Sequence, residues 1–137
     1  MKNELILSFC IWGFNDISPN GITKSLDITP TKVFIKCKKK NPKSPVLAAE
    51  NGWIMESTLD KYSSFDQQMT SLLDIIESKI ELFEPLCTKY YCEFSCAIFI
   101  YNDEESAPSV HLDTRYHSLA RKLNFEFDID LYCLQNE

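Results

Sequence analysis

The chain has 137 residues, 45% of them apolar and 25% charged, which is ordinary for a globular protein. Its length predicts one domain, residues 1–137, that buries a core without needing disulfides or metals. Twenty acidic side chains against fourteen basic ones give a net charge of -6. Because phosphate binding needs a basic surface, we expect no direct nucleic-acid partner, and the acidic charge fits a basic protein partner.

The apolar run near the N-terminus predicts a strand and no targeting or membrane segment. It lacks a signal-peptide cleavage site and is followed at once by a helix signal. No segment approaches the roughly 18 apolar residues of a membrane span. We therefore expect a cytoplasmic protein without membrane contact.

The six cysteines indicate reduced thiols. Four fall inside apolar strand patterns, where a free thiol behaves as a small hydrophobe: Cys10, Cys37, Cys96 and Cys133. Without an export signal, free thiols are favoured over disulfides. The spacing of Cys87, Cys92 and Cys96 matches no zinc finger or ribbon, and we expect no cofactor.

The first half of the chain predicts strands at 5–14, 31–39 and 52–58, with a polar, basic loop between the last two. Between the first two strands lies a short helix, for which Ser18 is a good N-cap and Pro19 a good first residue. A long helix follows, because Ser64 and Gln67 fit a capping box and apolar residues repeat at helical spacing up to Phe83.

The second half predicts strands at 92–102 and 109–114, a helix over 115–124 capped by Asp113 or Thr114, and a last strand at 125–133. The expected order is β-α-β-β-α-β-β-α-β. Three helices cannot cover both faces of a six-stranded sheet. The sequence therefore predicts an α+β domain with a mainly antiparallel sheet, helices on one face, and a second face without helices, here called the open face.

The last strand, "FEFDIDLYC", alternates without a break. Its apolar row is predicted to face the core: Phe125, Phe127, Ile129, Leu131 and Cys133. The other row holds three carboxylates and a tyrosine, with no positive residue among them. Strand parity adds four aromatic residues from other strands to the same open face. The candidate partner-binding residues are Glu126, Asp128, Asp130, Tyr132, Tyr101, Phe99, Phe34 and Trp12.

Two interpretations of this surface stay open. An exposed aromatic patch rimmed by charge often marks a contact site. Alternatively, the loop after the second strand or a terminus folds over the patch, so that the aromatic residues form a second small core. In that case the acidic residues form a solvated edge. A separate structural alternative is that Lys36, on a nearby strand, offsets part of the repulsion among the carboxylates if the two strands pair.

No catalytic signature stands out. His111 and His117, with Asp113 between them, suggest either a metal or acid–base site or simply two surface histidines. A nucleophile beside a base is not evident, and three glycines leave no phosphate-cradling loop. We do not expect an enzyme.

The order of several short motifs resembles the bacterial domain of unknown function 4279 over nearly the whole chain. The matching positions are Ile22, Thr23, Leu26, Pro30, Gly52, Trp53, Leu73, Asp74, Asp130, Leu131 and Tyr132. Where relatives often carry a glycine after the helix leucine, this chain has Asp27, so its helix end is expected to differ. The resemblance implies the order of elements and a bacterial, cytoplasmic origin, without an established activity.

Two hypotheses follow. Small acidic proteins of this kind resemble immunity proteins, the cytoplasmic antidotes of toxins exchanged between bacteria. The first hypothesis is therefore a non-enzymatic immunity protein that neutralises a basic toxin domain, with a nuclease as the first candidate, through its acidic and aromatic surface. The second is a small-molecule- or metal-binding module, with or without enzymatic activity, that uses the open face as its pocket.

Overall fold

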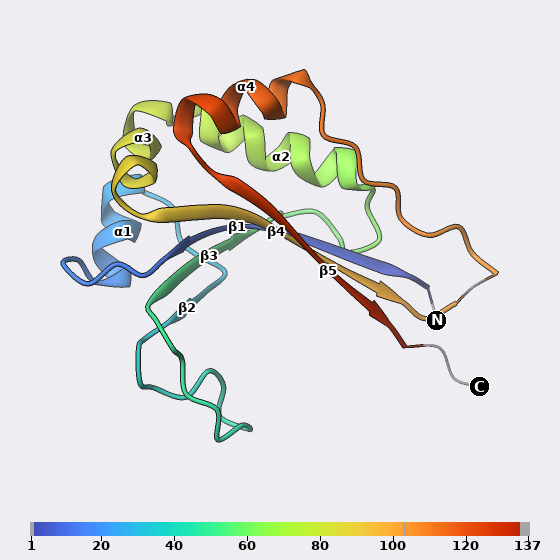
Figure 1. Cartoon of the computed structure of the whole chain (residues 1–137), viewed down its shortest axis with the longest axis horizontal. Coiled ribbons are helices and arrows are strands. Elements are labelled where there is room, and N and C mark those ends of the chain that lie inside the picture. Colours follow the sequence, from blue (N-terminus) through green and yellow to red (C-terminus); the bar gives the residue numbers. More distant parts are fainter. Residues whose placement is uncertain (1, 103, 135–137) are drawn as a thin grey trace.

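A computed structural model describes residues 2–102 and 104–134. Over these residues, a five-stranded sheet of order β2-β3-β1-β4-β5 carries four helices on one face (Figure 1). The strands are β1 (Glu4–Trp12), β2 (Lys32–Phe34), β3 (Gly52–Glu56), β4 (Tyr91–Ile100) and β5 (Glu126–Cys133). The helices are α1 (Pro19–Leu26), α2 (Phe65–Ser78), α3 (Ile80–Lys89) and α4 (Thr114–Leu123). The α+β class and the single helical layer are confirmed.

The sheet is mixed, although most of its pairs are antiparallel. β1 pairs with both β3 and β4 in antiparallel fashion, as β2 does with β3. β5 runs parallel to β4. This follows from the connection between them, because α4 crosses back over the sheet and returns the chain to the end where β4 began.

The core lies between the sheet and the helices. Phe9 of β1 sits at its centre, with the rings of Phe83, Phe94 and Phe125 packed edge-on at centroid distances of 5.6, 5.3 and 5.8 Å. The predicted helix signals are confirmed: Ser18 caps α1, Ser64 and Gln67 form a capping box on α2, and Asp113 caps α4.

Three element predictions need correction. The long helix is two helices, because Lys79 leaves the helical conformation (φ -128°, ψ 30°) between α2 and α3. The strand expected at 31–39 ends at Phe34, and the backbone turns left-handed at Cys37 (φ 68°). Residues 109–114 form no strand; Val110 and Leu112 pack against the core from a loop, and this packing explains their alternating pattern.

The end of α1 is capped without a glycine. Asp27 itself adopts the left-handed conformation (φ 55°, ψ 45°) and donates its backbone N–H to the carbonyl of Thr23. This is the C-cap geometry that glycine adopts most easily and Asp or Asn tolerates. The helix therefore ends where a glycine would have ended it.

Gln68 satisfies backbone groups in the first half of β1, where the strand does not pair with β3 before Ser8. Its side chain accepts from the N–H of Leu7 at 3.1 Å and donates to the carbonyls of Leu5 and Ser63 at 2.8 and 3.1 Å. Gln68 is 2% exposed, so it acts as a buried substitute for a neighbouring strand.

The cysteines divide into two groups. Cys87, Cys92 and Cys96 are buried in the core, and Cys10 is buried on the open side of β1. Cys37 and Cys133 are exposed, so the expectation that they are core residues is wrong. Within the described residues, no helix combines the length and apolar character needed to cross a membrane.

Candidate functional site

The open face of the sheet gathers all eight predicted contact residues. The register places Glu126, Asp128, Asp130 and Tyr132 of β5 on the same side as Glu93, Ser95, Ala97 and Phe99 of β4. Trp12 and Phe34 lie on that side of β1 and β2, and the Tyr101 ring stacks on Phe99 just beyond β4. Their positions agree with the prediction from strand parity, whereas their role remains a proposal.

At one end of the open face, two aromatic rings lie flat across the strands. The rings of Trp12 and Phe34 are nearly parallel, 6° apart, with centroids separated by 5.8 Å. They cross the sheet above Gly52, where an added Cβ would come within 2.5 Å of the Trp12 ring. A glycine at this position in β3 is what lets the indole approach the backbone so closely.

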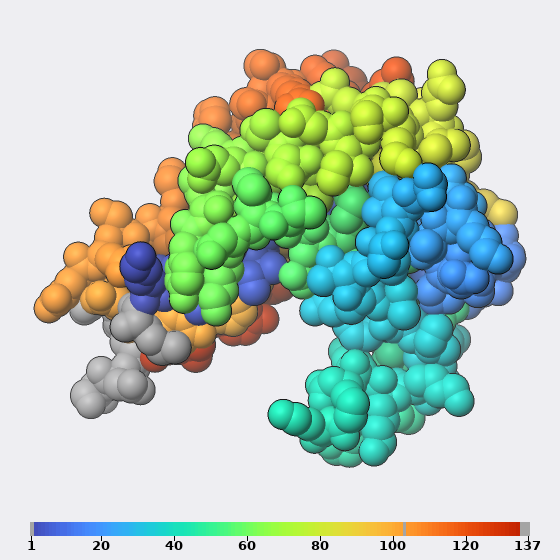
Figure 2. Space-filling view, turned by 180° about the vertical axis from the view of Figure 1, so that it is seen from behind, coloured from blue at the N-terminus to red at the C-terminus, as the bar shows by residue number. Residues whose placement is uncertain are grey.

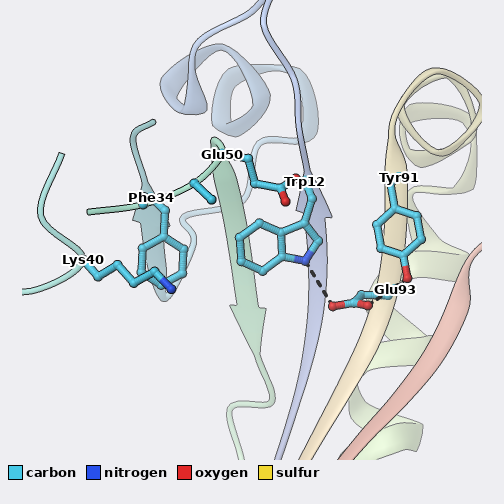
Figure 3. Close-up of a pocket in the computed structure, with 8 residues that line it drawn as sticks. Trp12, Phe34, Lys40, Glu50, Tyr91 and Glu93 are labelled. Carbon is cyan, nitrogen blue, oxygen red and sulfur yellow. Dashed lines mark hydrogen bonds between the residues drawn. The ribbon is translucent and has the colours of Figure 1, made fainter. Parts of the chain in front are cut away.

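Glu93 of β4 fixes the Trp12 ring from the strand on the other side of β1. It accepts a hydrogen bond from Trp12 Nε1 at 3.1 Å and another from the Tyr91 hydroxyl at 2.9 Å, through separate carboxylate oxygens (Figure 3). Partial burial, the bond to Glu93 and the negative charges of Glu93 and Glu126 raise the pKa of Tyr91 above its usual value. The phenol of Tyr91 therefore stays protonated around neutral pH, and the two hydrogen bonds fix the direction of the Glu93 carboxylate.

A cavity of about 340 Å³ opens above these rings. Trp12, Phe34, Tyr91 and Glu93 line it from the sheet, and the loop between β2 and β3 supplies its other wall: Lys40, Ala48, Ala49 and Glu50. This loop projects away from the sheet as a separate lobe (Figures 1 and 2). It therefore bounds one end of the open face and does not cover the aromatic residues as a second core.

A second aromatic group marks the other end of the open face. Phe99 stacks on Tyr132 of β5, with centroids 5.0 Å apart, and on Tyr101, with centroids 6.4 Å apart. Tyr132 is 45% exposed, so this stack presents an aromatic surface to solvent. It sits at the edge of the sheet, beside the acidic row of β5.

A shallow trough of about 250 Å³ joins the two aromatic groups. Its floor is made mainly of small side chains from the two central strands: Ser8, Cys10, Ser95 and Ala97. Lys32 and Glu56 form an ion pair at 3.9 Å along the β2–β3 border. Small residues between bulky rings produce a concave surface without any enclosed chamber.

The acidic row faces no cation on its neighbouring strand. Asp128 lies across from Ser95, Asp130 across from Ala97, and Glu126 across from Glu93. Lys36 cannot offset this charge, because it follows β2 at the opposite edge of the sheet, roughly 19 Å away at the usual strand spacing. The alternative in which Lys36 neutralises the row is therefore wrong.

The apolar row of β5 is core for only half its length. Phe125 is 5% exposed, but Ile129 and Leu131 are 47% and 61% exposed. Both face the helical side, as alternation predicts, yet they lie on an edge strand where the helices no longer cover the sheet. Edge position, which alternation cannot reveal, explains the difference.

The two histidines are surface residues on different segments. His111 is exposed in the loop before α4, and His117 is exposed on α4 with its ring edge-on to Tyr116 at 5.4 Å. Among residues 2–102 and 104–134, no group of three or more His, Cys, Asp or Glu side chains is placed to hold a metal ion.

Tyr91 and Glu93 belong to the site but were not among the contact residues predicted from the sequence. Glu93 has outward parity but no distinguishing pattern, and Tyr91 precedes the strand expected at 92–102. Their spacing of two, on the same row as Phe99, is the signal that was available.

Comparison with protein-family models shows which family the chain belongs to. The model of the family described as "Domain of unknown function (DUF4279)" matches residues 3–134, nearly the entire length. The chain belongs to the DUF4279 family. Comparisons with curated proteins and with solved structures gave no match.

Several positions that carry the DUF4279 resemblance hold the fold together. Trp53 is fully buried and donates its indole N–H to the hydroxyl of Thr23 at 3.1 Å, which ties β3 to α1. Asp74 of α2 accepts from Arg115 of α4 at 2.7 Å. Asp130 and Tyr132 differ from these, because their side chains lie on the open face.

Proposed function

We propose that this protein is a non-enzymatic binding protein that receives a basic protein partner on its open face. In its most concrete form, it is an immunity protein that neutralises a basic bacterial toxin domain such as a nuclease. Nuclease sites are lined with Lys and Arg to hold phosphates, so an inhibitor that blocks one presents carboxylates.

One observation carries the proposal: over the described residues, aromatic rings share a concave sheet face, free of helices, with carboxylates that lie across from Ser95 and Ala97 on the neighbouring strand. Aromatic residues dominate the energetics of protein contacts, because they bury a large area with little loss of side-chain freedom. The carboxylates of Asp128 and Asp130 add the charge that steers a basic partner and selects against acidic ones.

The test compares three versions of the protein as bait for its partner. Asp128→Asn/Asp130→Asn neutralises the acidic row, and Glu84→Gln/Glu105→Gln removes the same charge from two exposed residues outside the open face. Candidate partners are products of neighbouring genes and proteins captured from lysate, each then purified and measured directly. The proposal expects a basic protein that binds the wild type and the control but not the acidic-row variant. Equal binding to all three would contradict it.

A second candidate function is a small-molecule-binding module, which the cavity beside Trp12 favours. Its volume of about 340 Å³ lies in the range of ligand pockets, and its walls combine aromatic rings with a few polar groups. A metal-binding version would need the exposed His111 and His117 to converge with a carboxylate, and no such group occurs among residues 2–102 and 104–134. Mass analysis of gently purified protein for a retained small molecule separates this candidate from the first.

A further inference from the structure

The cavity beside Trp12 has the composition of a site for a flat organic cation. Trp12 and Phe34 provide two nearly parallel rings as its floor, and Tyr91 provides a third ring at its side. Aromatic faces attract cations placed within about 6 Å of the ring centre, and Trp does so most strongly. An apolar ligand would find good contact area here, but it would not use the carboxylates described next.

Two carboxylates face the same space from different elements. Glu93 approaches from β4 and Glu50 from the loop, on different sides of the Trp12 indole (Figure 3). Each oxygen of Glu93 accepts one hydrogen bond from the protein and keeps a further lone pair for a ligand. These bonds fix the direction of the carboxylate, so a ligand that pairs with it loses less side-chain freedom.

The charge around the cavity is negative. Glu50 and Glu93 line it, and Glu126 lies directly across from Glu93 on β5. Two cations lie at the Phe34 end, away from Glu93. Lys40 lines the cavity (Figure 3), and Lys32, which pairs with Glu56, has its Nζ 5.9 Å from the centroid of the Phe34 ring. A cationic ligand entering between Trp12 and Glu93 therefore meets favourable charge without displacing an ion pair.

We infer that this cavity receives an arginine side chain of the basic partner, with the guanidinium flat on the Trp12–Phe34 floor and paired with Glu93. Guanidinium is planar, is weakly hydrated, stacks on aromatic rings and pairs with carboxylates through several N–H groups. The compact ammonium of lysine matches the charge but not the flat floor. The inference rests on the proposed function, because the arginine belongs to the partner.

The two tryptophans of the chain give a direct readout. The indole N–H of Trp12 lies in the cavity, and that of Trp53 is bonded to Thr23 in the core. In a nitrogen–proton NMR spectrum, each contributes one side-chain resonance, assigned with Trp12→Phe. The probes are the N-acetyl amides of arginine, lysine and citrulline, added at constant ionic strength. Citrulline keeps the size and planarity of arginine without its charge.

The expected result is a saturable shift of the Trp12 resonance with the arginine probe, while the Trp53 resonance stays in place. The citrulline probe should bind at least about tenfold more weakly, since it cannot form the charge pair, and the lysine probe should also bind more weakly. Glu93→Gln should reduce arginine binding by a similar factor, and Glu84→Gln on α3 should leave it unchanged. The unmoved Trp53 resonance shows that each variant is folded.

Several results would overturn the inference. These are no saturable shift with the arginine probe, equal response to arginine and citrulline, lysine binding as tight as arginine, or full binding by Glu93→Gln. None of them bears on the acidic row of β5. If a basic partner still depends on Asp128 and Asp130 while Trp12 ignores arginine, the cavity assignment fails and the proposed function stands. If Trp12 responds as expected and no partner depends on the acidic row, the proposed function fails instead.

Discussion

Glu126 of β5 lies directly across from Glu93 of β4, with both side chains on the open face. Like charges at directly opposed positions of a sheet are destabilising. We therefore expect Glu126→Gln to raise the free energy of unfolding by about 0.2–1 kcal/mol. Urea denaturation at low salt measures this gain, which should shrink in high salt because the repulsion is between partly exposed groups. A loss of stability would mean that Glu126 makes a favourable contact in the fold.

Gln68 should be far more sensitive to substitution than its polarity suggests. Gln68→Leu leaves the N–H of Leu7 and the carbonyls of Leu5 and Ser63 without their partner. We expect the free energy of unfolding to fall by at least about 2 kcal/mol, because buried backbone groups would be left unsatisfied. The exposed Thr70→Leu on the same helix is the control and should change stability by less than about 0.5 kcal/mol. Equal effects of the two substitutions would contradict this role.

The sequence was sufficient for the helical caps, the order of most elements and the facing of the acidic row. These depend on local spacing: Ser64 with Gln67, or Asp128 and Asp130 two apart on a strand. The strand assigned to 109–114 failed for the opposite reason. Its alternation came from packing against the core and needed no neighbouring strand.

The cavity beside Trp12 could not be read from the sequence. It depends on the register that sets Trp12 above Gly52, and on a loop from β2 to β3 whose path has no periodic pattern. The parallel pairing of β5 with β4 likewise depends on where α4 returns the chain. Long-range geometry of this kind is decided by tertiary packing and not by local pattern.

Tyr91 should make the stability of the folded protein fall at alkaline pH. Its pKa is raised in the folded state, so its contribution is fully present below about pH 10 and is lost as the pH rises above that. We expect Tyr91→Phe to lose less stability between about pH 9 and pH 11 than the wild type. Burial also raises the pKa of Cys10 to about 12, so this thiol lowers the stability of the folded protein over part of the same pH range. Comparing the wild type with Tyr91→Phe isolates the contribution of Tyr91.

Glu93→Gln tests the cause of the shift in Tyr91. Gln at this position has no negative charge and offers the Tyr91 hydroxyl only a neutral amide oxygen as acceptor. The pKa of Tyr91 should therefore move down toward the ordinary value, while part of the elevation remains from burial and from Glu126. The ultraviolet absorbance of tyrosinate during a pH titration measures it, with Tyr91→Phe identifying the relevant step. An unchanged titration would remove Glu93 as a cause.

In the folded protein, two of the six cysteines should react with an alkylating reagent much faster than the other four. Cys37 and Cys133 are exposed and should be alkylated quickly in the folded protein. The other four should react slowly, because they are buried and burial raises the pKa of Cys10 and Cys96 to about 12. After denaturation without reductant, mass measurement should show six modified thiols. Fewer modified thiols, in protein kept from air, would indicate a disulfide and contradict the expected reducing compartment.

The affinity of the purified basic partner for Asp128→Asn/Asp130→Asn tests the central claim most directly, which is that the acidic row serves a partner. We expect stability equal to or slightly above that of the wild type, binding weaker by at least about 2 kcal/mol, and slower association with a flatter salt dependence. Glu84→Gln/Glu105→Gln, with the same net charge, should bind as the wild type does. A variant that melts early yet binds its partner normally would show that the fold, and not a partner, needs Asp128 and Asp130.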